Sequence, residues 1–371
     1  MFDYNNDFYA FLAGICIVAL CTYFGARLMG ALRLRIWNTM IIIVLGVSVL
    51  TAAGYGIISG ATKAYDDSIP VMNDTLDLNL YAPFTENTRA VSLEEEASWE
   101  MSEPLLKIDG ATAFYPLYAA FAQAVYPEAN YPNVLRDAIY DTDAYAYVND
   151  FVVCTTTPIA YNRLINGETD LIFVYGPSEE QLRIAEGKGV DLTFTLIGYD
   201  AFVFFVNAQN PVDNLSSDDI RRIYSSQARS WRAFGWRNVE IMAYQRPENS
   251  GSQTIMIDFM GDVPLMPSYY VADSMANAIK LVSYKNYQNA IGYSFLFFAT
   301  EMVQDNQIKL LSIDGVAPTR ENVANGTYPL TYEFYAVTAG TDNPNAEQFI
   351  EWILSPQGQY LVEKTGYTPV G

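Results

Sequence analysis

The sequence contains no histidine and only three cysteines. The first absence excludes Ser-His-Asp and Cys-His catalysis and removes the commonest zinc ligand. Cys16 and Cys21 lie in one apolar run and Cys154 lies far along the chain, so no disulfide framework is indicated. Lys188 and Lys280 could act as bases, but neither sits in a nucleophile motif. We therefore expect no enzyme activity, no bound metal and no cofactor.

Positive charge is scarce as well. The chain has 21 Lys and Arg against 42 Asp and Glu, a net charge of −21. Residues 1–65 carry four cations and two carboxylates, so the remainder has a net charge of about −23. This balance argues against binding to nucleic acid and against docking on anionic lipid by general attraction. Local donors could still hold a small anion, because salt screens the distant charges over about 8 Å.

Two long apolar runs occupy residues 8–28 and 36–59, and each is near the roughly 20 residues that cross a bilayer. The short segment between them carries Arg27, Arg33 and Arg35 without an acidic residue. The positive-inside rule places this segment in the cytoplasm and both termini outside. A cleaved signal peptide followed by a buried helix is the alternative, but no positive region precedes the first run. We expect residues 1–65 to form a two-pass transmembrane hairpin in the cell membrane.

Residues 66–104 mix Asp, Asn and Pro with the acidic run Glu94-Glu95-Glu96. We expect an extracellular acidic spacer there, with a solvated acidic face as the alternative. From Leu105 onward, strand-like and helix-like pieces alternate, and Asn345 to Lys364 reads as one long closing helix. This alternation predicts an α/β fold with mainly parallel strand pairing.

Three segments share one design, in which a strand end is followed by small or hydroxyl residues that open a helix. They are Asp109 to Ala113, Thr155 to Pro158, and Ser250 to Ser252. Each alone is typical of an ordinary cap or turn. Arg246 precedes the third segment by four residues, and a guanidinium beside a helix start suits a phosphate or a carboxylate. Together they predict a small-oxyanion site at the carboxyl ends of the strands.

These residues resemble a known family, the phosphate-binding proteins of phosphate ABC transporters. The resemblance rests on Gly110-Ala-Thr-Ala-Phe-Tyr-Pro-Leu, on Arg246-x-x-x-Ser250-Gly-Ser, on Ile291-Gly-Tyr and on the closing Phe349 to Tyr360. It covers about residues 105–371 and leaves the hairpin out. It implies a two-lobed, type 2 periplasmic-binding-protein fold with a hinge. One lobe would be residues 105–197 plus 330–371, and the other 198–329.

The resemblance also implies roles for single residues. Thr112 and the amide of Ala113 would bind phosphate oxygens from one helix start, and Thr157 would add a second hydroxyl. Arg246 would supply the charge, and Ser250, Gly251 and Ser252 would supply donors from the opposite lobe.

One departure from the family concerns the acceptor of the phosphate proton. The family usually has an Asp shortly after the strand that here reads Leu171 to Tyr175, but no carboxylate occurs before Glu179. Tyr175 or a carboxylate brought in by the fold could replace this Asp. Otherwise the protein would distinguish less sharply between protonated phosphate and fully deprotonated oxyanions, or it would bind a different ligand.

Together with the expected hairpin, the resemblance implies a membrane-anchored extracellular receptor. It would capture inorganic phosphate, or a related oxyanion, and deliver it to the permease subunits of an ABC importer. The alternative is a module of the same fold that senses an anion or forms a surface interaction without transport.

Overall fold

The computed structural model describes residues 17, 19–24, 39, 41–55, 76–131, 146–147, 151–267, 270–283 and 287–370. The chain divides into two compact units, Met1–Asp74 and Thr75–Gly371. Each unit is described by itself below.

In the first unit, residues 19–24 and 41–55 are helical. The second stretch leaves large apolar side chains open to solvent, among them Ile42, Val47 and Leu50. None of the helices described is both long and apolar enough to cross a membrane. The expected transmembrane hairpin is therefore not confirmed, and most of its residues lie outside the described ranges.

A seven-stranded mixed sheet runs through the second unit, in the order β1-β4-β11-β5-β8-β7, with β9 also paired to β5. Strands β1 and β4 are parallel, as are β7 and β8, whereas β11 and β5 run antiparallel to all their neighbours. The expected mainly parallel pairing is wrong for this sheet, because the two long central strands, β11 and β5, run antiparallel to each other and to the strands beside them. The strands are β1 (Ile108–Gly110), β4 (Leu171–Tyr175), β5 (Thr193–Asn207), β7 (Met242–Ala243), β8 (Ala290–Phe295), β9 (Ile308–Leu310) and β11 (Thr331–Thr338).

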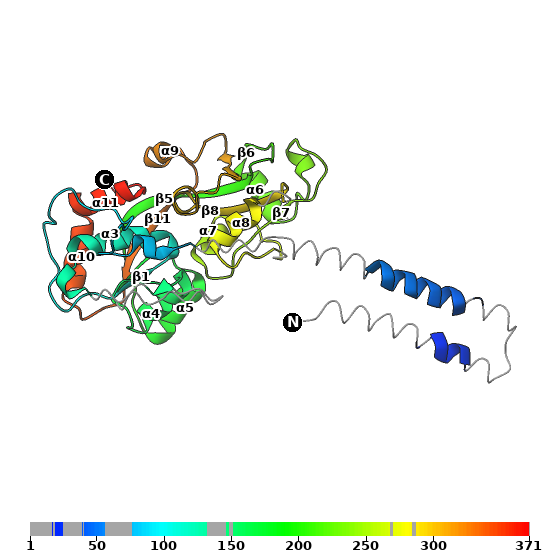
Figure 1. Cartoon of the computed structure of the whole chain (residues 1–371), viewed down its shortest axis with the longest axis horizontal. Coiled ribbons are helices and arrows are strands. Elements are labelled where there is room, and N and C mark those ends of the chain that lie inside the picture. Colours follow the sequence, from blue (N-terminus) through cyan, green and yellow to red (C-terminus); the bar gives the residue numbers. More distant parts are fainter. Residues whose placement is uncertain are drawn as a thin grey trace. The chain divides into compact units, whose positions relative to one another are not determined.

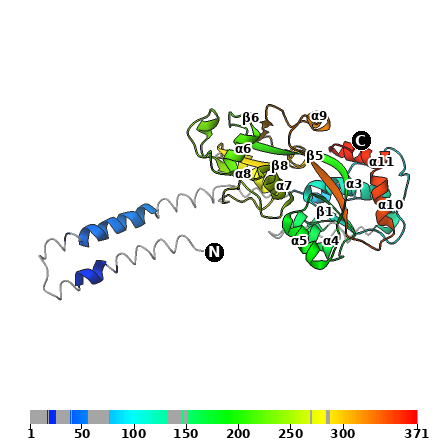
Figure 2. The same cartoon turned by 180° about the vertical axis from the view of Figure 1, so that it is seen from behind.

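Helices gather around both halves of this sheet (Figure 1). The view from behind shows α4 and α5 beside β1, and α6, α7 and α8 at the opposite half (Figure 2). The expected closing helix is in fact two, because Ser355 caps a new helix that Pro356 begins. The helices are α3 (Tyr115–Val125), α4 (Thr157–Ile165), α5 (Glu179–Lys188), α6 (Ser217–Tyr224), α7 (Gly251–Met260), α8 (Met275–Ser283), α9 (Arg320–Ala324), α10 (Asn345–Ile353) and α11 (Pro356–Thr365).

Strand β5 divides the domain into two lobes. Its residues 193–201 pair with β11, and its residues 202–206 pair with β8. The N–H of Phe202 donates to the carbonyl of Leu330 at 2.8 Å, so a second segment crosses beside it. We call the part built on β1, β4 and β11 lobe one, and the part built on β7, β8 and β9 lobe two. This two-lobed α/β architecture confirms the predicted fold class.

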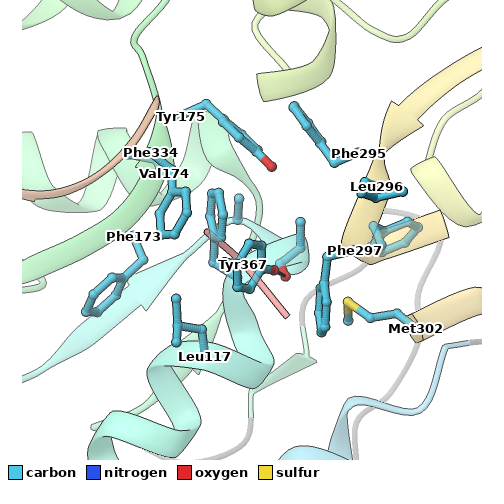
Figure 3. Packing of buried hydrophobic residues seen from close by; sticks show 14 of the residues in the cluster. Leu117, Phe173, Val174, Tyr175, Phe295, Leu296, Phe297, Met302, Phe334 and Tyr367 are labelled. Atoms are coloured by element: carbon cyan, nitrogen blue, oxygen red, sulfur yellow. Dashed lines mark hydrogen bonds between the residues drawn. The ribbon is translucent and has the colours of Figure 1, made fainter. Parts of the chain in front are cut away.

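Aromatic side chains from both lobes pack together near the crossing (Figure 3). Tyr175 of β4 stacks on Phe295 of β8 with ring centroids 3.7 Å apart. Phe114 contacts Tyr175, Phe334 and Tyr367. Burial of these rings fixes the end of β4 against lobe two.

Residues 76–104 differ from the expected spacer. Leu78, Tyr81 and Met101 are buried in the same core as lobe one, and the N–H of Met101 donates to the carbonyl of Val125. Apolar side chains bring this segment onto the domain, because their burial outweighs the solvation of the acidic residues between them.

A buried carboxylate lies at the crossing itself. Asp200 is on β5, next to the residue where the pairing changes from β11 to β8. It accepts hydrogen bonds from the hydroxyl of Tyr175 at 3.1 Å and from the N–H of Ala201 at 2.8 Å. Loss of hydration raises the pKa of Asp200 to about 7, although these two donors act to lower it.

This shift predicts a pH-dependent stability. A carboxyl whose pKa is raised on folding binds a proton more tightly in the folded state, so stability falls as the pH rises from the ordinary value of 3.8 to about 7. Asp200→Asn should remove this contribution. Thermal unfolding across that range should show wild type losing stability relative to the variant as the pH rises. A constant difference between the two proteins would contradict the buried, proton-binding Asp200.

Candidate functional site

The first predicted segment of lobe one begins directly after β1. Thr112 and Ala113 start the short 3-10 turn η2 (Thr112–Phe114), which leads into α3. The first amides of such a turn have no partner within it. The side chain of Thr112 contacts the thiol of Cys154 through a hydrogen bond, and the carbonyl of Ala113 accepts a hydrogen bond from the hydroxyl of Tyr367. These contacts hold the turn beside β3 (Val153–Cys154), the strand that precedes the second segment.

The second segment meets lobe two. Thr157 is the first residue of α4 and is 5% exposed. A Cβ built on Gly251, the first residue of α7, would lie 3.0 Å from Oγ1 of Thr157. The two helix starts, predicted as donors from opposite lobes, are therefore in contact. Glycine at position 251 keeps the space between them open, because a Cβ there would crowd the hydroxyl of Thr157.

Asp109 anchors the second segment, and its role was missed in the sequence. The carboxylate is fully buried and accepts hydrogen bonds from the N–H of Thr155 at 2.9 Å and from its hydroxyl. It also accepts from the N–H of Gly110 at 2.7 Å and pairs with Arg163 of α4 at 2.7 Å. Burial nevertheless raises the pKa of Asp109 to about 6. The only signal in the sequence was an acidic residue at a strand end.

The start of α7 presents donors from lobe two. The hydroxyl of Ser250 caps this helix by accepting from the N–H of Gln253 at 3.3 Å. The amides of Gly251 and Ser252 belong to the first turn, which leaves them without a partner in the helix. Oγ of Ser252 is buried and has no hydrogen-bond partner. A buried hydroxyl in that state is costly unless a ligand satisfies it.

Arg246 stands beside this helix start with part of its guanidinium unused. Its N–H donates to Tyr293 and to Gln253, at 3.0 Å each, which fixes the backbone. Nη1 donates to the carbonyl of Ala272, whereas Nε is buried and has no partner. Burial lowers the pKa of Arg246 to about 10, so it remains a cation at neutral pH. Within the described ranges it forms no salt bridge.

Tyr175 contacts the site with its ring, and its hydroxyl is oriented by a buried carboxylate. Its Cδ2 would be 3.5 Å from a Cβ on Gly251, whereas its hydroxyl donates to Asp200. The fold thus brings a carboxylate to the tyrosine that ends the predicted strand.

A polar clasp joins the lobes beside this position. The hydroxyl of Ser178 donates to Oδ1 of Asn249 at 2.9 Å, and Nε2 of Gln181 donates to the carbonyl of Asn249 at 3.2 Å. Asn249 adopts a left-handed conformation, with φ at 64°, which turns the chain into the start of α7.

Removal of the Asp109 carboxylate should destabilise the protein strongly. Asp109→Ala leaves Arg163 and two buried amides without their acceptor, so we expect a loss of about 3–5 kcal/mol. Urea unfolding measures this difference. The control is Asp191→Ala, which removes an exposed carboxylate and should cost less than about 0.5 kcal/mol. Similar losses in the two variants would show that Asp109 does not anchor the segment.

Comparison with known proteins places this geometry in a family. The profile of the PBP superfamily domain matches residues 82–357. The phosphate-binding protein PstS of Bacillus subtilis (strain 168) is 28% identical over 189 residues, which is 50% of this chain and 61% of that protein. Protein SphX of Synechococcus elongatus is 23% identical over 297 residues, or 74% of this chain and 80% of that protein. The match to PstS thus spans about three fifths of that relative's length.

Solved structures share the same fold. The Clostridium perfringens protein solved with bound phosphate superposes with a TM-score of 0.55 and 22% identity, covering 72% of this chain and 99% of that one. An ABC-type phosphate transport receptor from Vibrio cholerae gives a TM-score of 0.51 and 18% identity, with coverage of 71% and 99%. The profile of the PBP superfamily domain matches most of this chain, and the chain has the two-lobed fold. This chain therefore belongs to the PBP superfamily.

Proposed function

We propose that this chain is a binding protein, not an enzyme, that captures inorganic phosphate or a related oxyanion outside the cell for an ABC importer. The observation that carries the proposal is the pair of buried donors without partners, Nε of Arg246 and Oγ of Ser252. Ser252 lies in α7, the helix whose first residue contacts Thr157 of the other lobe, and Arg246 lies in the loop that leads into that helix. A tetrahedral oxyanion has enough acceptors to satisfy donors that arrive from several directions.

The expected donors suffice for useful affinity. Hydrogen bonds to a charged group contribute about 1.5–3 kcal/mol each, and micromolar binding needs about 8 kcal/mol. The proposed donors are Thr112, the amide of Ala113, Thr157, Arg246, Ser250, Gly251 and Ser252. Desolvation of the anion and closure of the lobes reduce the sum. The relatives named as phosphate-binding proteins support phosphate as the anion.

Tyr175 with Asp200 is our candidate for the missing family carboxylate. A tyrosine hydroxyl that donates to Asp200 keeps acceptor capacity of its own. Its oxygen would accept a hydrogen bond from a protonated phosphate, while its own O–H donates to the buried carboxylate of Asp200. Sulfate, which carries no such proton at neutral pH, would gain nothing from this pair.

Ligand capture would couple to movement of the lobes. The proposed lobes are residues 105–197 plus 330–371 and residues 198–329, joined at the crossing near Asp200. Because the donors come from both lobes, the anion would favour the closed state. The Asn249 clasp would be made and broken with that movement.

We further propose that residues 1–65 anchor the domain as a transmembrane hairpin. The exposed apolar side chains of residues 41–55 support this, since such a surface requires an apolar partner. Residues 66–75 would then form the short link to the domain, which would lie outside the cell near the permease subunits. The alternative function, anion sensing or surface interaction without transport, would use the same site.

Loss of the guanidinium should abolish binding. Calorimetric titration of the full chain with phosphate should show at least a 100-fold loss of affinity in Arg246→Ala, because the anion loses its charge-assisted donors. Arg183→Ala, an exposed arginine paired only with Glu180, is the matched control and should bind as wild type does. Wild-type affinity in Arg246→Ala would refute the site. Sulfate titrated in parallel tests the role given to Tyr175.

Thr157 should act through its hydroxyl alone. Thr157→Val keeps the shape of the side chain and removes one donor to a charged ligand, so phosphate affinity should fall about 10- to 150-fold. Thr157→Ser restores the hydroxyl and should recover most of the affinity. Equal affinity in the valine and serine variants would show that Thr157 does not bind the anion.

A further inference from the structure

Lobe two carries a cluster of arginines that the anion site does not use. Residues 220–239 contain five Arg and no Asp or Glu, in a chain whose net charge is −21. Arg221 packs against Phe259: its Nε donates to the carbonyl of Phe259, and its guanidinium lies 4.6 Å from the Phe259 ring centroid. The other four are Arg222, Arg229, Arg232 and Arg237.

A buried tryptophan holds this surface rigid. Trp231 is fully buried, and its indole N–H donates to the carbonyl of Asn289 at 2.7 Å. It begins the 3-10 turn η4 (Trp231–Phe234), after which Gly235 turns the chain with φ at 84°. Phe234 and Trp236 both contact Trp231, with ring centroids 6.0 Å and 6.3 Å away, and both remain partly exposed.

Two of the arginines lie against these rings, and Arg229 and Arg232 belong to the same segment of the chain. Arg222 lies 5.9 Å from the ring centroid of Phe234, and Arg237 lies 4.4 Å from that of Trp236. We call the set the arginine–tryptophan patch; it comprises Arg222, Arg229, Arg232, Phe234, Trp236 and Arg237.

Most of the charge on the patch is uncompensated. Arg222 pairs with Asp219 at 3.1 Å. Arg229, Arg232 and Arg237 are exposed, and in the part of the chain that the structure describes none of them forms a salt bridge. Among the described residues, Arg229 and Arg237 hydrogen-bond to neutral oxygens, the carbonyl of Ser226 and Oε1 of Gln288.

We propose that the arginine–tryptophan patch docks lobe two on the anionic surface of a phospholipid bilayer. Guanidinium groups pair with phosphate in a bidentate manner, and a partly exposed indole suits the boundary between headgroups and acyl chains. Anionic lipid complements the patch in charge. The rest of the domain is acidic, but screening over about 8 Å limits its repulsion to residues close to the surface.

The inference rests on the proposed membrane anchor, which makes docking an intramolecular event. A tethered domain meets the bilayer at a high effective concentration, so a small patch is sufficient. Docking would restrict the orientation of lobe two while leaving the anion site untouched, because no residue of the patch belongs to that site.

The test uses the full chain reconstituted in lipid nanodiscs, either zwitterionic or containing phosphatidylglycerol, with a headgroup nitroxide quencher. The chain has five Trp, so subtracting the emission of Trp236→Phe isolates Trp236. We expect Trp236 to be quenched in anionic discs, and this quenching to be lost in Arg229→Ser/Arg232→Ser/Arg237→Ser and at raised salt.

The matched control removes the same charge elsewhere. Arg183→Ser/Lys188→Ser/Lys364→Ser takes away three exposed cations and should leave the quenching unchanged. Phosphate affinity should be the same in both triple variants, which confirms folding and separates this inference from the anion site.

Several results would overturn the docking. Unquenched Trp236 in a chain that co-purifies with the discs would overturn the docking alone, as would quenching that ignores the arginine changes. Shielding of Trp236 only by an added acidic protein would assign the patch to a protein partner. Failure to co-purify with either disc would overturn the anchor and the docking together.

Discussion

The contact between Thr157 and Gly251 is the constraint on which the structure of the site depends. It favours glycine at the start of α7, because a Cβ there would lie 3.0 Å from the hydroxyl of Thr157. It also requires both lobes to deliver a helix start to one point. Backbone amides at such points carry partial positive charge, and Arg246 adds a full one. An oxyanion between them would satisfy donors that the protein alone leaves unpaired.

Two buried carboxylates, Asp109 and Asp200, hold in place the segments that meet at this contact. Asp109 fixes the segment before Thr157 to β1, and Asp200 ties the end of β4 to the crossing strand. Both have raised pKa values, because loss of hydration disfavours each carboxylate more than its hydrogen-bond donors and nearby arginine stabilise it. Each of these two carboxylates is therefore buried at an electrostatic cost, at a position that fixes how the segments of the site are arranged. Such groups fix the arrangement of the site, and removing one of them leaves its buried partners without an acceptor.

The segments that we propose to bind the anion were readable from the sequence because each is a local pattern. Hydroxyl and glycine residues at a helix start act through their own backbone, so a short window predicts Thr112, Thr157 and Ser250 to Ser252. The break before Pro356 is also a local pattern, because Ser355 and Pro356 are typical of a helix start. Residues 76–104 were misjudged for another reason, since a few spaced apolar residues such as Leu78 and Met101 decided their packing against the charge of the segment.

What the sequence by itself determined is the chemistry: an acidic, histidine-free chain with donors for a small anion and one cation beside them. The tertiary structure alone decided which of these groups meet. Strand β5 pairs with one lobe along its first part and with the other along its second, and that long-range pairing made the sheet mixed and placed Asp200 beside Tyr175. Contacts between residues far apart in the chain depend on how the whole core packs, and no short pattern encodes them.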